Sequence, residues 1–273
     1  MDILEKYQIR GVPGHAHRTS IDSRRVDFWS PENPTHLIVC HDGQNILDRR
    51  TATRRKTWQL AKASIRVAEE LGITPPAIIG VYHGRTKEDP NGRYKDLTPE
   101  APYRNGVKPI LPPGYSQLDL TELRGDWYQK WIAETVVPTI AAEIGLDLVR
   151  EKTAMLGSSM GGLATLYGAG LYPDLYGAAL SFSPHWVIGA NPLVDALIDA
   201  LPGPDRLRLW MSRGTKGLDG TYEPFQDYAD ERAQDRGFVM GQNLSSKVFE
   251  RTSHSEKSWA SYVDQALRFW LDA

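Results

Sequence analysis

A serine stands between two glycines in residues 152–162, which read K-T-A-M-L-G-S-S-M-G-G. A G-x-S-x-G pattern starts at Gly157, after a short apolar run and before a stretch of helical character. A serine on a sharp strand-to-helix turn needs glycine two places before and after it, because larger residues would make the strand and the helix collide. Ser158 fails this test, since apolar side chains would then stand in the glycine places. The pattern predicts that Ser159 is a nucleophile, and the alternative is a simple Gly/Ser loop that ends a strand.

A serine hydroxyl also needs a general base, and the base needs an acid that fixes its tautomer. In hydrolases with a strand-turn-helix serine, the chain order is Ser, then Asp or Glu, then His. Only His185 and His254 follow Ser159, and only His254 also follows an acid on a loop after a predicted strand. We therefore expect His254 to be the base, although it could instead be a surface residue at a helix start. Asp219 is the favoured acid, and Glu223 is the alternative at the beginning of the next predicted helix.

The tetrahedral intermediate of such a reaction needs N–H donors. One is expected from the backbone of Met160, directly after the nucleophile. The other is expected from the Asp42-Gly43-Gln44 turn after the first parallel strand, with the Gln44 N–H as the candidate. Losing one donor of this kind typically costs about 3–4 kcal/mol of barrier. Taken alone, Asp-Gly would be only a turn.

Strands and helices alternate from Thr35 to the end of the chain. Nearly unbroken apolar strands separated by helices predict an α/β fold with a mostly parallel sheet, helices on both faces and an antiparallel N-terminal edge. The expected strands cover 7–11, 24–29, 35–40, 77–83, 153–156, 177–182, 206–212 and 246–251. The expected helices cover 54–71, 126–144, 163–171, 192–201, 222–236 and a last segment after His254, with a kink at Pro138. His15 and His17 are expected in a flexible loop.

Residues 84–122 interrupt this alternation. They are rich in proline and contain Tyr94, Tyr103 and Tyr115. A loop of this length in a compact domain is usually functional or disordered. We therefore expect a cap or binding loop within a single domain that covers residues 1–273. With Trp58, Trp127 and Trp186, these tyrosines suggest an aromatic-rich pocket, although aromatic residues also fill cores.

The composition excludes several classes of protein. A net charge of −2 over 273 residues argues against a nucleic-acid partner, and 41% apolar residues allow a sizeable core. The N-terminus carries acids and no long apolar run, so no signal peptide is expected, and no segment approaches the roughly 18 apolar residues of a membrane span. Cys40 is the single cysteine. A cytoplasmic protein without cofactor, metal, membrane or nucleic-acid partner is expected; a metal site on His15, His17, His41 and Asp42 is a remote alternative.

Five motifs carry a resemblance to a known family: H-D-G-Q-N, G-S-S-M-G-G, F-S-P-H-W, G-T-K-G-L-D-G-T-Y-E-P and H-S-E-K-S-W. In this order and spacing the chain resembles the putative-esterase (esterase D-like) branch of the α/β-hydrolase superfamily over roughly residues 20–270. The branch includes enterochelin-type trilactone esterases, feruloyl and acetyl-xylan esterases, S-formylglutathione hydrolases and mycolyltransferases.

The resemblance implies the roles that were expected above: Ser159 as nucleophile, Asp219 as acid, His254 as base, and Gln44 and Met160 as backbone N–H donors. It further implies that Trp186 lies near the acyl or alcohol pocket, unless it is a capping aromatic, and we also expect substrate contacts from His41 and Asp42. Lys216 is a departure, because members often carry a glutamate in that segment. If that glutamate were the family's acid, Asp219 would have to replace it.

The function expected from these features is a serine carboxylesterase that acts through a Ser159 acyl-enzyme on a small-molecule ester. An acyltransferase of the same family and a non-catalytic binding protein with an inherited fold are the alternatives. The sequence leaves open whether the ester is a feruloyl or aryl, siderophore, sugar or thioester substrate, and whether the chain forms a homo-oligomer.

Overall fold

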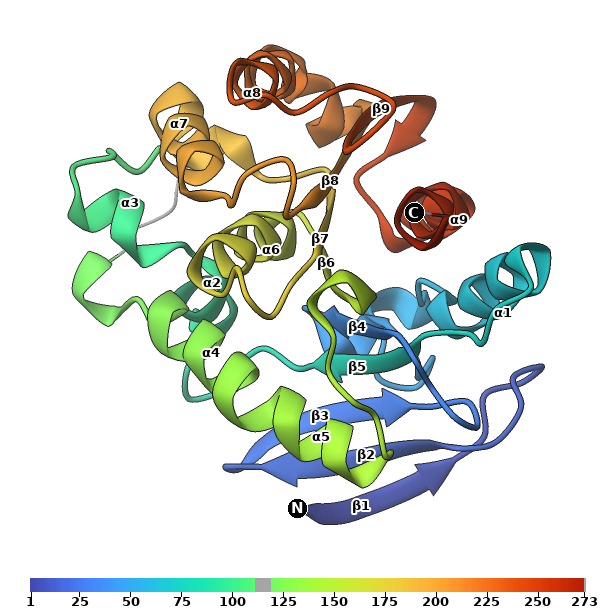
Figure 1. Cartoon of the computed structure of the whole chain (residues 1–273). Coiled ribbons are helices and arrows are strands. Elements are labelled where there is room, and N and C mark those ends of the chain that lie inside the picture. The colour runs from blue at the N-terminus through green and yellow to red at the C-terminus, as the bar shows by residue number, and fades with distance from the viewer. Residues whose placement is uncertain (111–118, 273) are drawn as a thin grey trace.

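Buried apolar strands form the centre of a nine-stranded sheet in the computed structural model, which describes residues 1–110 and 119–272 (Figure 1). The strand order is β1-β2-β3-β5-β4-β6-β7-β8-β9. The strands from β5 across to β9 are parallel, as their continuous apolar sequences predicted. Their bounds are β4 Leu37–Cys40, β5 Ala77–Val81, β6 Thr153–Ser158, β7 Ala178–Phe182, β8 Arg208–Lys216 and β9 Leu244–Ser253.

The N-terminal edge of the sheet is antiparallel, as expected, but it has one strand more than the sequence suggested. The strands are β1 Asp2–Tyr7, β2 Ala16–Ile21 and β3 Arg24–Trp29. The strand expected at 7–11 was wrong, because the chain leaves the sheet at Tyr7. His17 is not in a flexible loop: it belongs to β2 and stacks on Phe28 of β3, with 5.0 Å between ring centroids. The hairpin closes through Asp22 and Ser23, which both have positive φ.

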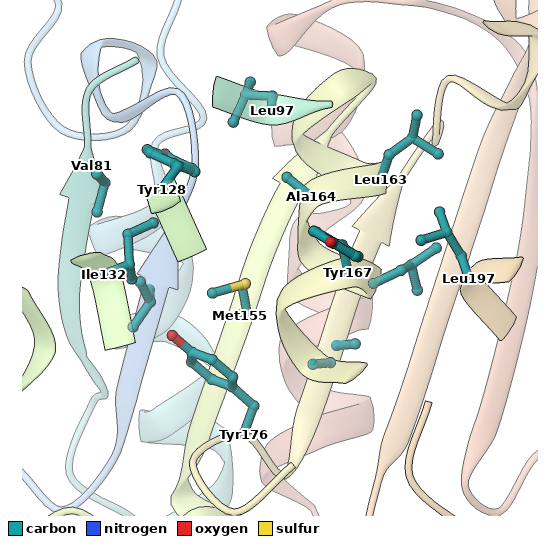
Figure 2. Close-up of a cluster of buried hydrophobic side chains, with 14 of the residues drawn as sticks. Val81, Leu97, Tyr128, Ile132, Met155, Leu163, Ala164, Tyr167, Tyr176 and Leu197 are labelled. Carbon is teal, nitrogen blue, oxygen red and sulfur yellow. The ribbon is translucent and has the colours of Figure 1, made fainter. Parts of the chain in front are cut away.

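Helices cover both faces of the sheet. The two apolar clusters on its faces involve α1 and α9 on one side and α4 to α8 on the other (Figure 1). Figure 2 shows part of the second cluster, with Met155 of β6 between Tyr128 and Tyr167. The bounds are α1 Leu60–Leu71, α4 Gly125–Trp131, α5 Val137–Glu143, α6 Met160–Leu171, α7 Ala190–Ala200, α8 Glu223–Asp235 and α9 Glu256–Leu271.

Two helices differ from the expected pattern for local reasons. The first helix begins at Leu60 rather than at residue 54, because Arg54, Arg55 and Gln59 have left-handed φ values that an α-helix does not accept. The helix expected over 126–144 contains a π-helical segment, Ile132–Val136, which ends two residues before Pro138. Proline has no N–H to donate to the preceding turn of the helix. The expected break at this proline is therefore a change of helical pitch.

Short helical turns complete the architecture. They are η1 Gly43–Asn45, η2 Thr53–Arg55, η3 Leu120–Glu122, η5 Arg150–Lys152, η6 Trp186–Ile188 and η7 Gly217–Thr221, while the π-helical segment is labelled η4. Strand β8 runs four residues past the expected end at Ser212, because Gly214 and Lys216 still pair with β9.

The segment 84–122 holds secondary structure of its own, with α2 Gly92–Leu97 and α3 Glu100–Arg104. Buried Asp96 ties it to the sheet edge, since its carboxylate accepts hydrogen bonds from Arg24 and Arg124 at 2.6 and 3.0 Å. Tyr103 is buried and donates to the Ile188 carbonyl, and Tyr115 lies outside the described residues. That this segment caps the site stays a prediction. No helix within the described residues is long and apolar enough to cross a membrane.

Candidate active site

Ser159 occupies a strained turn between β6 and α6, with φ 58° and ψ −124°. Such backbone geometry is rare for a residue with a side chain and persists only where the surrounding structure imposes it. The glycines make it possible: a Cβ on Gly157 would lie 2.3 Å from the Gly161 carbonyl oxygen. A Cβ on Gly161 would lie 3.2 Å from Cβ of His41. The turn therefore has the steric form that the G-x-S-x-G pattern predicts.

His254 and Asp219 meet at the same end of the sheet. His254 follows β9 directly, and Asp219 lies in η7 directly after β8. Strands β8 and β9 are parallel neighbours (Figure 1), so the segments that follow them begin at the same end of the sheet. Nδ1 of His254 lies 2.5 Å from Oδ1 of Asp219, which is fully buried. This leaves Nε2 of the imidazole as the nitrogen that can exchange a proton with another group.

The second oxygen of Asp219 is held by groups that sequence reasoning missed. Oδ2 accepts hydrogen bonds from the Ser183 hydroxyl at 2.9 Å and the Gly214 N–H at 2.8 Å. The indole N–H of Trp259 in turn donates to the Ser183 oxygen at 3.0 Å. A Cβ on Gly214 would lie 2.4 Å from the Thr252 carbonyl oxygen, so this close approach requires glycine. The signal available in the sequence was the position of Ser183 directly after the apolar strand.

Glu223, the alternative acid, points elsewhere. Its side chain is 64% exposed and pairs with Arg213 at 2.8 Å. The structure therefore brings Asp219, and not Glu223, to the imidazole of His254. Lys216 ends β8 as an exposed residue.

Tyr222 and His185 form a second pair beside Ser159 that the sequence did not reveal. The Tyr222 hydroxyl contacts Nδ1 of His185 and interacts with the Ser159 side chain. Tyr222 also donates its backbone N–H to the Asp219 carbonyl, so one turn positions both side chains. Burial, with a smaller effect of His254, lowers the pKa of His185 to about 4. Burial and the nearby Asp219 carboxylate raise the pKa of Tyr222 far above its ordinary value. At neutral pH the pair is therefore a neutral imidazole and a protonated phenol.

The two predicted N–H donors lie at the starts of helical turns. Met160 is the first residue of α6, where a helix offers no acceptor for its N–H. Gln44 lies in η1, after Asp42 in the left-handed conformation. Gly43 is required between them, because a Cβ there would lie 2.3 Å from the Gly80 carbonyl.

The carboxylate of Asp42 is already engaged. The Arg93 guanidinium from α2 donates to both of its oxygens at 2.8 and 2.6 Å. Burial acts to raise the pKa of Asp42, but the charge and hydrogen bonds of Arg93 prevail and lower it to about 2. This ion pair ties the segment expected as a cap to the loop of the Gln44 N–H.

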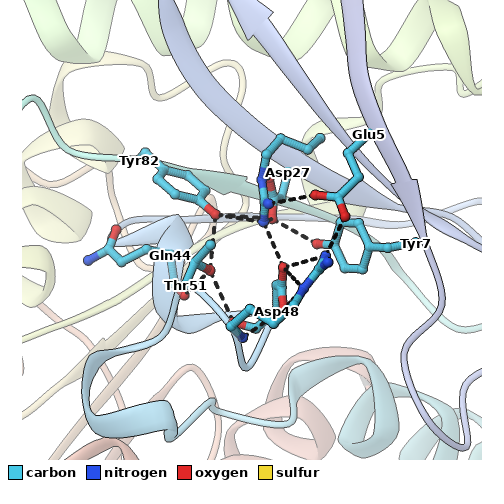
Figure 3. A network of polar contacts seen from close by, with 9 residues as sticks. Glu5, Tyr7, Asp27, Gln44, Asp48, Thr51 and Tyr82 are labelled. Carbon is cyan, nitrogen blue, oxygen red and sulfur yellow. Dashed lines mark hydrogen bonds and ion pairs between the residues drawn. The ribbon is translucent and has the colours of Figure 1, made fainter.

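A buried polar network anchors the other side of this loop (Figure 3). The Thr51 hydroxyl donates to the Gln44 carbonyl at 2.9 Å, and the Tyr82 hydroxyl lies 3.2 Å from Thr51. Tyr82 and Arg18 both donate to the Asp27 carboxylate. The antiparallel edge strands are thereby connected to the turn that carries the Gln44 N–H.

These groups surround a pocket of about 440 Å³. Among its lining residues are Ser159, His254, Met160, Gln44, Asp42, Arg93 and His185. The lining contains two aromatic residues other than histidine, Tyr94 and Trp259, within the described residues. Among the described residues the pocket lining is therefore mainly polar, and of the aromatic residues expected in it only Tyr94 lines it there.

The tryptophans that were expected at the pocket lie elsewhere in the structure. Trp186 is fully buried and donates its indole N–H to Gln226, so His185 faces the pocket while Trp186 packs in the core. Trp58 is buried edge-on against Phe182, and Trp127 is half-exposed on the surface. The expectation that Trp186 lies at the substrate pocket was therefore wrong.

His41 also points away from the pocket. It is buried, and its Nδ1 lies 3.2 Å from the Tyr128 hydroxyl. Burial lowers the pKa of His41 to about 4. Its contact with Tyr128 and its position under Gly161 give it a packing role behind the turn, instead of the expected substrate contact. Across residues 1–110 and 119–272, no three His, Cys, Asp or Glu side chains are grouped as metal ligands.

Comparisons with known proteins agree with this architecture. The model of the family described as "Putative esterase" matches residues 22–270. The enterobactin esterase FES from Shigella flexneri superposes with a TM-score of 0.64 at 14% identity, covering 98% of this chain and 62% of that one. This chain thus spans less than two thirds of the length of FES.

Two further solved structures match along nearly their whole length. The enterobactin and salmochelin hydrolase IroE has a TM-score of 0.60 at 20% identity, covering 93% of both chains. The BES protein from Bacillus cereus has a TM-score of 0.59 at 17% identity, covering 97% of this chain and 94% of that one. Together these likenesses confirm the predicted α/β-hydrolase fold. No protein with a curated description matches the chain.

Proposed function

This chain belongs to the putative esterase family, and we propose that it is a carboxylic ester hydrolase that cleaves its substrate through an acyl-enzyme on Ser159. One observation carries the proposal. The imidazole of His254, bonded to Asp219 at 2.5 Å, lines the same pocket as Ser159 on its strained turn. A nucleophile, an acid and a base in this chain order form the arrangement of serine hydrolases with a strand-turn-helix serine.

The first half-reaction uses each group once. Oγ of Ser159 adds to the ester carbonyl carbon while its proton passes to Nε2 of His254. The carbon–oxygen bond to the alcohol then breaks, and the alcohol leaves with the proton from Nε2. Asp219 stabilises the imidazolium that exists between these steps, because it accepts the Nδ1 hydrogen bond throughout. Water repeats the sequence and releases the carboxylic acid.

The negative oxygen of the tetrahedral intermediate would be bound by the backbone N–H groups of Met160 and Gln44. The left-handed Asp42 and the Thr51 anchor support this role for Gln44, since both restrict the turn before the reaction starts. Donors placed in advance need no reorganisation as charge develops on the oxygen.

The polar lining of the pocket favours an ester with polar substituents near the reacting carbonyl. Its lining includes Arg54, Arg85, His83, Asn45 and Glu256. Uncharged aromatic esters would find few apolar partners in this part of the pocket.

Ser159→Ala tests the proposal, with Ser158→Ala as the matched control one residue away. Hydrolysis of a nitrophenyl acetate by purified Ser159→Ala should fall by at least about a thousandfold, and covalent labelling by a fluorophosphonate should disappear. Ser158→Ala should keep both the ester hydrolysis and the fluorophosphonate labelling. If Ser159→Ala hydrolyses the ester near the wild-type rate, the acyl-enzyme proposal is wrong. Product analysis with added alcohols separates hydrolysis from acyl transfer, because transfer yields a new ester.

A further inference from the structure

A second pocket, outside the candidate active site, is lined by basic side chains and no acidic ones. It has a volume of about 540 Å³ and lies among η2, the start of α1 and the start of α9. Ile46, Leu47 and Leu60 give it an apolar floor. We call it the cationic pocket because of the six basic residues that line it: Arg10, Arg49, Arg55, Lys56, Lys62 and Lys257.

None of these six side chains has a carboxylate partner among the described residues, although basic residues close to them in the chain do. On the same two helices, Arg66 pairs with Asp264 at 2.8 Å and Arg268 with Glu70 at 2.7 Å. Arg50, next to Arg49, contacts Glu5 at 2.7 Å. Ion pairs therefore neutralise the contact between α1 and α9 farther along the helices, while the end that faces the pocket keeps its positive charge.

The helix ends add to this charge. The N-terminus of a helix carries a partial positive charge, so a lysine there is unfavourable unless an anion is close by. Lys62 lies in the first turn of α1, which has neither an acidic residue nor a side-chain cap. Lys257 lies in the first turn of α9, whose one acid, Glu256, accepts a hydrogen bond from Asn45 beside the active-site pocket.

The cationic pocket adjoins the candidate active site. Arg54 lines the active-site pocket, and its neighbour Arg55 lines the cationic pocket. Likewise, Glu256 lines the active-site pocket, and the next residue, Lys257, lines the cationic pocket. Two short segments therefore separate the pockets, and one extended ligand could occupy both.

We propose that the cationic pocket binds a phosphate-type anion, carried either by the ester substrate or by a separate ligand. Such an anion would supply the negative charge that no carboxylate provides, and guanidinium and ammonium groups bind phosphate oxygens through charge-assisted hydrogen bonds. This inference goes beyond the proposed esterase activity and does not depend on Ser159.

Calorimetric titration with inorganic pyrophosphate tests the site directly. The wild-type protein should bind pyrophosphate, and the affinity should fall as the salt concentration rises. The double variant Lys62→Gln/Lys257→Gln should bind at least about tenfold more weakly. The matched control, Arg66→Gln/Arg268→Gln, removes two positive charges from the same helices and should bind like the wild type.

Two outcomes would overturn the proposal. One is a wild-type protein that shows no pyrophosphate binding at millimolar concentration. The other is a control variant that loses as much affinity as the pocket variant, since the effect would then reflect net charge alone. Ser159→Ala should bind pyrophosphate unchanged, so the proposed site and the proposed acyl-enzyme can fail separately.

Kinetics distinguish the two sources of the anion. An acetyl ester with a phosphorylated alcohol portion is compared with its unphosphorylated counterpart. If the substrate carries the anion, Lys62→Gln/Lys257→Gln should raise KM at least about tenfold for the phosphorylated ester and leave the other ester unaffected. If a separate ligand carries it, KM should be unchanged for both esters while pyrophosphate binding is still lost.

Discussion

Nδ1 of His254 lies 2.5 Å from Oδ1 of Asp219, and the other oxygen of this buried carboxylate is also occupied. Ser183 and the Gly214 N–H donate to Oδ2, so the carboxylate cannot rotate without breaking hydrogen bonds at both oxygens. A carboxylate held in this way orients the imidazole, and Nε2 of the ring is left for the proton transfers of the proposed reaction.

Asp219→Asn should lower kcat/KM for ester hydrolysis by about 10³- to 10⁴-fold. An amide can present its NH₂ group to Nδ1, which favours the wrong imidazole tautomer, and it does not stabilise the imidazolium. Steady-state hydrolysis of a nitrophenyl ester measures the loss.

Glu223→Gln is the control for the acid that the sequence left open. It changes a carboxylate that lies four residues after Asp219 and forms a surface pair with Arg213, so kcat/KM should stay within about twofold of the wild type. A large loss in Glu223→Gln together with a small one in Asp219→Asn would reverse the assignment.

Tyr222→Phe should lower kcat/KM by about three- to tenfold, the equivalent of one hydrogen bond of roughly 1 kcal/mol. The change removes the hydroxyl that contacts His185 and interacts with Ser159, and it keeps the ring. The rate of fluorophosphonate labelling at Ser159 should fall in parallel.

Tyr228→Phe controls for the loss of a tyrosine hydroxyl. Tyr228 of α8 donates to Asp195 of α7 at 2.8 Å, and neither residue lines the active-site pocket. Labelling rates and kcat/KM should match the wild type in this variant. Wild-type values for Tyr222→Phe as well would show that its hydroxyl has no part in the reaction.

Acid should destabilise the protein through its buried neutral histidines. His41 and His185 have pKa values lowered to about 4 from an ordinary 6.5, mainly by burial. As the pH falls below 6.5 the unfolded chain takes up protons that the folded chain refuses, so stability present above 6.5 is lost progressively towards pH 4. The loss is on the order of 3 kcal/mol for each histidine.

Urea denaturation between pH 7 and pH 4.5 checks this dependence. His41→Gln should flatten the slope of unfolding free energy against pH by up to about 1.4 kcal/mol per pH unit, whatever it does to stability at pH 7. The exposed His15 provides the control, and His15→Gln should keep the wild-type slope. An unchanged slope in His41→Gln would contradict a neutral buried imidazole at this position.

The sequence predicted the parts of the fold that depend on local patterns. Apolar runs located β4 to β9, and the ends of β6, β8 and β9 placed Ser159, Asp219 and His254 at one edge. Their catalytic roles stay predictions, but parallel strands ending at the same edge explain why the chain order was informative.

Contacts between loops could not be predicted in this way. Ser183 reaches Asp219 across 36 positions, and Tyr222 meets His185 across 37. No periodicity encodes either contact. Trp186 was misplaced for a related reason: at a turn, neighbouring side chains face different sides, and composition does not say which one faces the core.

The glycines around Ser159 give the last prediction, because the structure ranks two positions that the motif treats alike. A Cβ on Gly157 would lie 2.3 Å from a backbone oxygen, that of Gly161, and 3.0 Å from Thr165 Oγ1. A Cβ on Gly161 meets the Cβ of His41 at 3.2 Å, which a shift of a few tenths of an ångström relieves.

Gly157→Ala should therefore lower the free energy of unfolding by about 3 kcal/mol or more and abolish labelling at Ser159, since a backbone overlap displaces the turn itself. Gly161→Ala should cost about 1 kcal/mol and retain measurable labelling. Urea denaturation and fluorophosphonate labelling of both variants measure the difference. If Gly161→Ala were the more damaging of the two, packing against His41, and not the approach of β6 to α6, would be what limits the size of residues in this turn.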